Sequence, residues 1–380
     1  MKIGLVAENY YPTVGGIQEH VYHLARWLRS NGADVRILTG DTGLPTAACP
    51  PGAMDDVIHV GRALRYPVMG TYSYMTVGPD AVGSLWNVLR REQFDLLHLH
   101  GPLDVGVPLL AHALYHGPMV FTLHSCFPDA PWRRVVAPLY RAALRRAAAI
   151  IAVSEATRAS VARYADFDSE IIPNGVDIAY WQKGQALDRF RDGWRNLLFV
   201  GRLEPRNGID ALFRAFTRIA DKAPRVRLIV AGDGPMRKAC EDAVPARLRD
   251  RVVFLGAVNG DRADLFASAD LLLLPAQIVG FSILVLEALA AGLPVVASPG
   301  QGVRTAGAHW ATAIVSADGS PESFADTVLA GLESDNSARI RRGFQVVKEY
   351  DWSNVAPRVF DVYQRALERV ATRASLLDVA

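Results

Sequence analysis

The side chains with the clearest chemistry stand just after predicted strands. His124 ends the apolar run Met119–His124, and Arg202 follows the apolar run Asn196–Val200. Ligands of open parallel sheets bind beyond the carboxyl ends of the strands, so both residues are candidates for a binding site. A guanidinium has a planar fork of donors that matches phosphate oxygens. Arg202 is therefore predicted to hold a diphosphate, with a salt bridge to Glu204 as the structural alternative.

A second candidate region is the stretch Leu271–Ser298, which is typical of a strand, a loop, a helix and a second strand. Amides at a helix N-terminus bind phosphate, and those candidates are Gly280, Phe281, Ser282 and Ile283. Glu287 lies further along this helix among apolar residues, so its carboxylate needs a partner. The two hydroxyls of a ribose would be suitable donors, and a solvated carboxylate is the structural alternative.

Glycines mark two further strand ends. Gly15 and Gly16 follow the first strand, where they allow a backbone to approach a phosphate or sugar closely. A simple tight turn is the alternative for this pair. Gly232 follows a later strand and is expected to shape the floor of the same site. The glycines after the first strand do not follow the pattern G-x-G-x-x-G, which argues against a site for a nicotinamide cofactor.

One predicted strand contains two histidines, a residue type that commonly binds metal ions. His98 and His100 occur in the strand Leu96–His100. We expect their side chains to point to opposite faces, with His100 nearer the binding site. Without a third ligand nearby in the sequence, a metal site is not predicted here.

Strands and helices alternate along the whole chain, which predicts βαβ units and parallel sheets. The remaining strands of the first series are Lys2–Ala7, Asp34–Thr39, Ala149–Ser154 and Glu170–Ile172. The second series adds Arg227–Ala231, Val252–Leu255, Leu271–Pro275 and Pro294–Ala297. The fold class is therefore α/β, with two Rossmann-like, doubly wound domains facing across a cleft. We expect a first domain at 1–173 and a second domain at 174–352, with a final helix at 353–371 that packs back on the first domain.

Composition limits the functional classes. The formal net charge of 380 residues is only +2, which does not suggest a nucleic-acid partner. Three widely spaced cysteines indicate neither a disulfide framework nor a zinc motif. We find no signal peptide and no membrane-spanning run, so the expected location is cytoplasmic, either free or at the inner face of the membrane.

One basic segment could contact an anionic membrane. The sequence from 131 to 146 places Trp132 and Tyr140 among five arginines, which are Arg133, Arg134, Arg141, Arg145 and Arg146. Basic residues at an anionic surface contribute about 1 kcal/mol each. An ordinary solvated helix face explains the pattern equally well.

Taken in order, these motifs resemble the retaining glycosyltransferases of family four, which have the two-domain GT-B fold. The resemblance covers nearly the whole chain and rests on Gly15-Gly16, His124, Gly201-Arg202-Leu203, Gly232-Asp233-Gly234 and Leu286-Glu287-Ala288. Within the family, Gly15–Val21, Phe94–His100 and Tyr350–Ser353 resemble the phosphatidylinositol mannosyltransferases of bacterial membranes.

The resemblance implies transfer of a sugar from a nucleotide diphosphate sugar to an acceptor, with retained anomeric configuration. It implies that Gly16 lies against the diphosphate or acceptor, that His124 contacts the transferred sugar, and that Glu287 holds the ribose. Arg202 would neutralise the leaving diphosphate, so no metal and no other cofactor is expected. The resemblance also implies that 1–173 is the acceptor domain and 174–352 the nucleotide-sugar donor domain, and that the acceptor is a small molecule or a membrane lipid or polyol headgroup.

The chain departs from the family pattern at three donor-side positions. Asn207 replaces a lysine, Val279 replaces the first of two acids, and Ser282 replaces a glycine. One hypothesis is an active transferase with altered donor handling, and the alternative is a degenerate homologue that acts as a binding or partner subunit. A nucleotide-sugar epimerase is a third class. Arg206 could substitute for the missing lysine, although it lies one position away.

Overall fold

The computed structural model describes residues 1–377 except 14, 47–48, 69–70, 103–104, 127–130, 259, 261, 277–280 and 301–311. Within the described residues, the side chains at 67, 68, 71, 72, 131–133, 136 and 373–377 are left out. The chain divides into two compact units. The first comprises Met1–Pro67, Tyr72–Gly175 and Trp352–Ala380, and the second comprises Val176–Asp351 together with Val68–Thr71.

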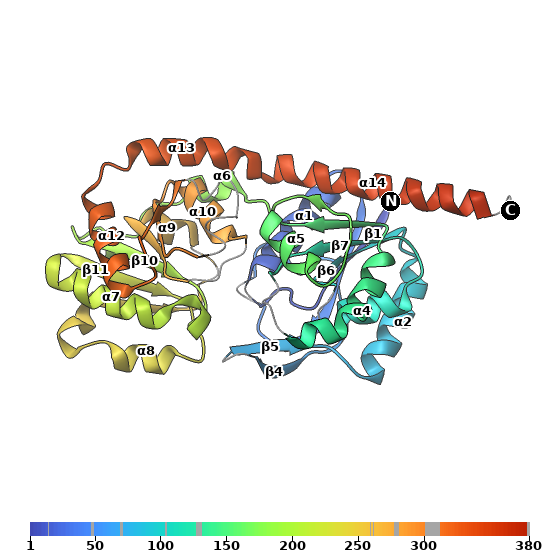
Figure 1. The fold of residues 1–380 in the computed structure, drawn as a ribbon, viewed down its shortest axis with the longest axis horizontal. Helices are drawn as coiled ribbons and strands as arrows, with labels where there is room; N and C mark the ends of the chain where they lie inside the picture. The colour runs from blue at the N-terminus through green and yellow to red at the C-terminus, as the bar shows by residue number, and fades with distance from the viewer. Residues whose placement is uncertain are drawn as a thin grey trace. The chain divides into compact units, whose positions relative to one another are not determined.

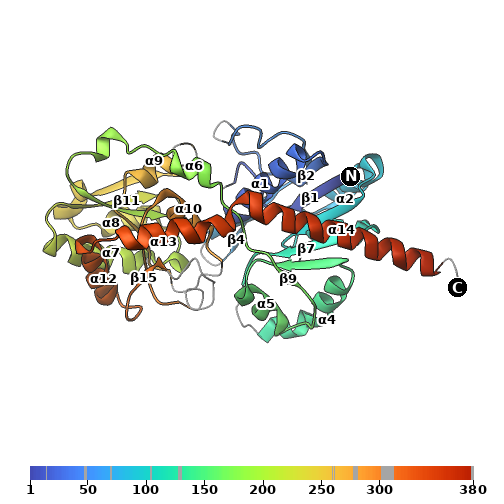
Figure 2. The ribbon, with the colours of Figure 1, turned by 90° about the horizontal axis from the view of Figure 1, so that it is seen from above.

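The first unit contains a parallel sheet of seven strands in the order β3-β2-β1-β6-β7-β8-β9. Their bounds are β1 Lys2–Ala7, β2 Asp34–Asp41, β3 Val57–Arg62, β6 Leu96–His100, β7 Met119–Leu123, β8 Ala149–Ala152 and β9 Glu170–Ile171. Helices of this unit are α1 Gly16–Ser30, α2 Pro79–Glu92, α3 Val107–Leu114, α4 Pro131–Arg145, α5 Glu155–Ala162 and α14 Trp352–Leu377. The helices and strands of this unit are shown in Figures 1 and 2.

Both faces of the middle of this sheet are buried, which explains why its central strands β1, β6, β7 and β8 are mainly apolar rather than alternating. Ile3 and Leu5 of β1 pack into one core with α1 and α14, whereas Val6 packs into a second core with α2 and α3. The inner residues of α14, such as Val359, belong to the first of these cores. The final helix is therefore part of the first unit although it comes last in the sequence.

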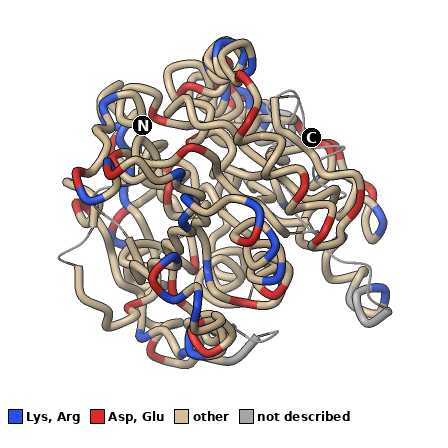
Figure 3. The backbone as a smooth tube through the Cα atoms, turned by 90° about the vertical axis from the view of Figure 1, so that its left-hand side faces the viewer, with Lys and Arg blue, Asp and Glu red and all other residues tan. Residues whose placement is uncertain are grey.

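The second unit contains a parallel sheet of six strands in the order β12-β11-β10-β13-β14-β15. Their bounds are β10 Arg195–Val200, β11 Val226–Ala231, β12 Val252–Gly256, β13 Leu271–Leu274, β14 Val295–Ala297 and β15 Ile314–Val315. Its α-helices are α6 Ile178–Gln182, α7 Ile209–Lys222, α8 Arg237–Ala243, α9 Arg262–Ala267, α10 Ile283–Ala291, α12 Pro321–Glu333 and α13 Ser337–Val347. Acidic and basic residues are interspersed along the backbone on the side shown in Figure 3.

The predicted α/β class with two parallel, doubly wound sheets is confirmed. The strand Leu96–His100 has the predicted bounds. Sequence reasoning missed β3 and the two-stranded sheet of β4 (Leu64–Val68) and β5 (Thr71–Met75), because these segments lack a long apolar run. Among the described helices, none is both long and apolar enough to cross a bilayer.

Candidate active site

Three loops of the second unit meet at the carboxyl ends of β10, β11 and β13, and their contacts require glycine. A Cβ on Gly232 would lie 1.8 Å from the carbonyl oxygen of Gly201, so the backbones of these two loops touch directly. Gly208 has φ +73°, and a Cβ there would lie 2.5 Å from the Pro275 carbonyl oxygen. Such close approach leaves backbone exposed at the strand ends, where a ligand can reach it.

The loop from Gly201 to Gly208 holds the candidate diphosphate ligands. Arg202 has a side chain that is 45% exposed, and its Nε lies 3.8 Å from a carboxylate oxygen of buried Glu204. Arg206 is also paired with Glu204. Asn207 donates from Nδ2 to the Arg202 carbonyl oxygen at 2.8 Å, so its amide braces the loop. The structural alternative for Arg202, a bridge to Glu204, is present, yet much of its guanidinium remains exposed.

Helix α10 begins at Ile283, two residues later than the predicted start near Phe281. Ser282 is its N-cap, but the hydroxyl makes no capping hydrogen bond to the helix backbone. Phe281 packs against Tyr350 with ring centroids 6.1 Å apart. Val279 and Gly280 lie outside the described residues. The first amides of α10 therefore have no side-chain cap from Ser282.

Glu287 is buried in α10, with only 3% of the residue exposed. Its carboxylate receives a hydrogen bond from Nη2 of Arg262 at 2.5 Å, and the two charges form an ion pair. Arg262 begins α9, and its guanidinium lies over the ring of Trp181 at 5.1 Å from the centroid. The requirement for a partner was predicted from the apolar neighbours of Glu287. The identity of that partner was missed, because nothing in the sequence links two residues that are 25 positions apart.

In the first unit, the loop after β1 is held by its own side chains. Helix α1 begins at Gly16, with Gly15 as its N-cap. Gln18 donates from Nε2 to the Thr13 hydroxyl at 2.6 Å, and that hydroxyl donates to the Tyr10 carbonyl oxygen at 2.6 Å. A Cβ on Gly15 would meet the end of the Gln18 side chain at 2.8 Å. The two glycines therefore lie in an ordered turn between β1 and α1.

The expectation that His98 and His100 point to opposite faces is wrong, because residues two apart on a strand share a face. Their ring centroids are 4.1 Å apart. His98 has a partner at each ring nitrogen: the Tyr363 hydroxyl at Nδ1 and the Thr122 hydroxyl at Nε2, both at 2.6 Å. It is therefore a structural histidine that ties β6 to β7 and α14.

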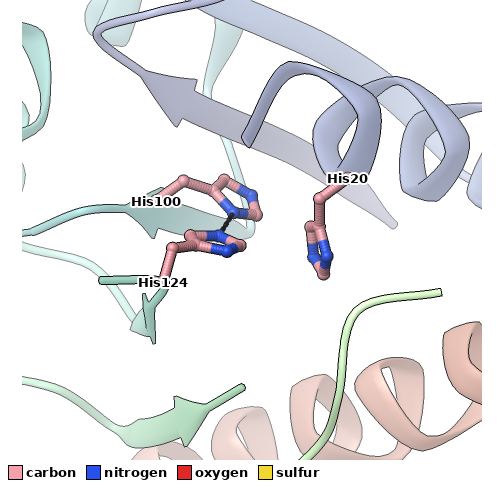
Figure 4. Close-up of side chains that lie close together, drawn as sticks. All are labelled: His20, His100 and His124. Carbon is pink, nitrogen blue, oxygen red and sulfur yellow. Dashed lines mark hydrogen bonds between the residues drawn. The ribbon is translucent and has the colours of Figure 1, made fainter. Parts of the chain in front are cut away.

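His100 and His124 lie beside His20 of α1, as Figure 4 shows. Nδ1 of His100 and Nε2 of His124 are 3.0 Å apart and share one hydrogen bond. The His20 ring meets the His124 ring edge to face, with centroids 4.8 Å apart. Sequence reasoning missed His20 as a site residue, although it lies in the motif that begins with Gly15.

Burial keeps these imidazoles neutral. It lowers the pKa of His20 to about 4, because a charged ring would lose its hydration. Burial also lowers the pKa of His100 and of His124, and neighbouring imidazoles add to the effect. At neutral pH each ring therefore has one N–H and one lone pair.

Helix α4 contains most of the basic segment. Arg134, Arg141 and Arg145 are exposed, and the side chain of Arg133 is not described. The side chains of Val135 and Leu139 lie one turn apart and are 79% and 69% exposed. Arg146 follows the helix and donates to the carbonyl oxygens of His112 and Tyr115. Its guanidinium therefore anchors the end of α3 as well as adding charge.

Comparison with known proteins agrees with this architecture. The family model described as Glycosyltransferase Family 4 matches residues 14–180, and the model described as Glycosyl transferases group 1 matches residues 195–334. The chain belongs to the GT-B glycosyltransferases of family four and is a glycosyltransferase.

Its curated relatives include the phosphatidyl-myo-inositol mannosyltransferases. The Mycobacterium tuberculosis protein is 30% identical over 373 residues, covering 96% of this chain and 97% of the relative. The Mycolicibacterium smegmatis protein is 31% identical, covering 96% of this chain and 94% of the relative.

Solved structures share the fold. Sucrose-phosphate synthase from Thermosynechococcus elongatus has a TM-score of 0.78 at 20% identity, with 97% of this chain and 99% of that chain covered. Anabaena HepE, solved with UDP-glucose, has a TM-score of 0.74 at 19% identity, with 98% of this chain and 100% of that chain covered.

Proposed function

We propose that this glycosyltransferase transfers a sugar from a nucleotide diphosphate to a lipid or polyol headgroup, with retained anomeric configuration and without a metal at the diphosphate. The observation that carries the proposal is the exposed Arg202 on a glycine-built loop at the carboxyl ends of parallel strands. Similarity over nearly the full length to proteins named phosphatidyl-myo-inositol mannosyltransferase supports a lipid headgroup as acceptor.

In this proposal the second unit binds the donor. The amides at the start of α10 and the guanidinium of Arg202 neutralise the diphosphate as it leaves. The bond from the anomeric carbon to the leaving phosphate oxygen breaks, and the acceptor hydroxyl oxygen bonds to the anomeric carbon on the same face. The proton of that hydroxyl passes to the leaving phosphate oxygen. Glu287, oriented by Arg262, accepts from the ribose hydroxyls. His124 of the first unit contacts the transferred sugar.

Arg202→Gln tests the donor-binding part of the proposal. Loss of one charge-assisted hydrogen bond is worth about 1.5–3 kcal/mol, so kcat/KM should fall roughly 10- to 100-fold. Arg206→Gln is the matched control, because Arg206 lies in the same loop but is paired with Glu204. Its kcat/KM should change by less than about threefold, because the buried Glu204 carboxylate with which Arg206 pairs keeps Arg202 as a second partner. Equal losses in the two variants would instead assign Arg206 to the position of the missing lysine.

The assay uses vesicles containing phosphatidylinositol and a panel of nucleotide sugars, with calorimetry for nucleotide binding. Formation of a glycolipid whose new bond has the donor's anomeric configuration is the expected result. If no nucleoside diphosphate or nucleotide sugar binds to the folded protein, the transferase proposal fails and the degenerate-homologue hypothesis gains support. Product analysis without acceptor would expose an epimerase.

Val279→Glu tests the altered donor side, on the basis of the sequence pattern. Restoring the family acid should increase or broaden donor use if this is a modified catalytic site. No gain in any donor would instead favour a decayed site.

We also propose that α4 contacts an anionic membrane. The exposed apolar pair Val135 and Leu139, beside arginines on the same helix, fits a helix lying in the interface. Arg141→Gln/Arg145→Gln removes two charges and should weaken binding to vesicles containing phosphatidylserine by roughly 30-fold. The control Arg214→Gln/Arg218→Gln removes two charges from α7. Cosedimentation that is indifferent to lipid charge, or equally weakened by both double variants, would overturn the proposal.

A further inference from the structure

The three-histidine cluster of the first unit contains polar atoms with no partner. Its members are His20, His100 and His124, which together have six ring nitrogens (Figure 4). Only the pair Nδ1 of His100 and Nε2 of His124 is hydrogen-bonded. Among the described residues, the other four nitrogens, which include both of His20, are buried and have no hydrogen-bond partner of good geometry, although the Asn174 side chain lies near enough to raise the pKa of His20 and of His124. Buried polar groups are rarely left this way, and an ion or a water commonly accounts for them.

The geometry brings one nitrogen of each ring together. One ligand atom from each histidine lies within 4.8 Å of the others. The residues come from three separate places in the chain: the first turns of α1, the end of β6 and the position after β7. His98 provides an internal contrast, because both of its ring nitrogens have hydroxyl partners. The three rings that face one another therefore differ from His98, and the single orphan nitrogen of His112 lies outside their cluster.

The 3.0 Å separation between His100 Nδ1 and His124 Nε2 is compatible with a shared metal ion. At a metal–nitrogen distance of about 2.1 Å, two ligands so placed subtend about 90° at the ion. The ion would replace their hydrogen bond, and the bridging proton would move to the far nitrogen of the same ring. The ligand atoms of the three rings lie within 4.8 Å of one another, so His20 has to move closer to complete the set.

A fourth polar side chain, that of Asn174, borders the cluster. Among the described residues, the buried Oδ1 of Asn174 has no hydrogen-bond partner of good geometry. The Asn174 side chain lies near enough to raise the pKa of both His20 and His124, against the larger lowering by burial. Three imidazoles and no carboxylate favour Zn²⁺, Co²⁺ or Ni²⁺ over Mg²⁺ or Ca²⁺, which prefer oxygen ligands. A three-histidine set also leaves a coordination position open for water or another ligand.

We propose that His20, His100 and His124 bind a divalent transition-metal ion in the first unit, at a site distinct from the diphosphate-binding loops of the second unit. The ion would take up the orphan nitrogens and fix the orientation of His124. A ligated His124 cannot also use that nitrogen for a sugar. Metal loading should therefore inhibit transfer, and this consequence alone rests on the proposed function.

The test is a titration of the chelator-treated full chain with Co²⁺, followed by visible absorption, and competition with Zn²⁺. We expect one Co²⁺ per chain, with the intense bands of a four- or five-coordinate nitrogen site. His20→Phe keeps an aromatic ring but removes a ligand, and it should weaken binding at least about tenfold. His23→Phe is the matched control on the same helix. His23 stacks on Trp352 with centroids 5.7 Å apart and lies outside the cluster, so its replacement should leave Co²⁺ affinity unchanged.

Two results would overturn the metal site. One is the absence of saturable Co²⁺ binding by the folded wild-type chain, or only the weak spectrum of a six-coordinate oxygen site. The other is equal Co²⁺ affinity in wild type and His20→Phe. Circular dichroism establishes whether the variant folds, and the wild-type spectrum decides the question if it does not. Binding without inhibition would leave the metal site standing and count against the role of His124 in sugar contact.

Discussion

Arg262→Met probes the ion pair that holds Glu287. Glu287 has a side chain that is 4% exposed, and Arg262 has one that is 15% exposed. Removing one partner of a buried pair costs about 3–5 kcal/mol, because the other charge stays buried. The cation–π contact with Trp181 adds about 0.5–2 kcal/mol. Since Arg262 retains some contact with water, we expect the free energy of unfolding to fall by about 3 kcal/mol.

A double-mutant cycle separates this pairing from simple loss of packing. Glu287→Leu alone should cost less than Arg262→Met, because the arginine can still be partly hydrated. The double variant Arg262→Met/Glu287→Leu should recover most of the stability, since an apolar pair of similar volume can replace a buried ion pair with little cost. Urea unfolding at pH 7.5, followed by circular dichroism, gives the four free energies.

The control is Arg237→Met, which breaks an exposed pair with Glu241 at 2.9 Å on α8. It should change stability by no more than about 1 kcal/mol. The reasoning is refuted if the losses of Arg262→Met and Glu287→Leu simply add in the double variant within about 0.5 kcal/mol, as they do for independent sites.

Two further outcomes follow from the contacts. Gly232→Ala should abolish nucleoside diphosphate binding in calorimetry, because the new Cβ would lie 1.8 Å from the Gly201 carbonyl oxygen. The control Gly260→Ala should bind normally, because a Cβ there would have no described heavy atom within 4 Å. Glu92→Gln should lose stability at pH 7, because a hydrogen bond from Lys2 holds the Glu92 pKa below its usual value of 4.5. That contribution to stability is present above pH 4.5 and is lost as the pH falls through the lowered pKa of Glu92. The difference in thermal unfolding temperature between wild type and variant should therefore shrink in acid. A difference that stays constant with pH would contradict this prediction.

The sequence by itself determined the architecture. Apolar runs of strand length, separated by segments of helical period, predicted two parallel sheets because strands covered on both faces have no polar alternation. The same local patterns placed His124, Arg202 and the glycines at strand ends, where parallel sheets bind ligands. The demand of Glu287 for a partner was also local, since it follows from one acid among apolar neighbours.

Only the tertiary structure decided which distant residues meet. Arg262 pairs with Glu287 through the packing of α9 on α10, and no short-range pattern reports that contact. His20 reaches His100 and His124 because α1 packs beside the ends of β6 and β7. Their neutrality depends on the burial that results, since an exposed imidazole would keep its ordinary pKa. The sequence determines which chemical groups the side chains carry. The partners of those groups and their protonation states depend on which residues lie close together in the fold and on how far burial removes them from water.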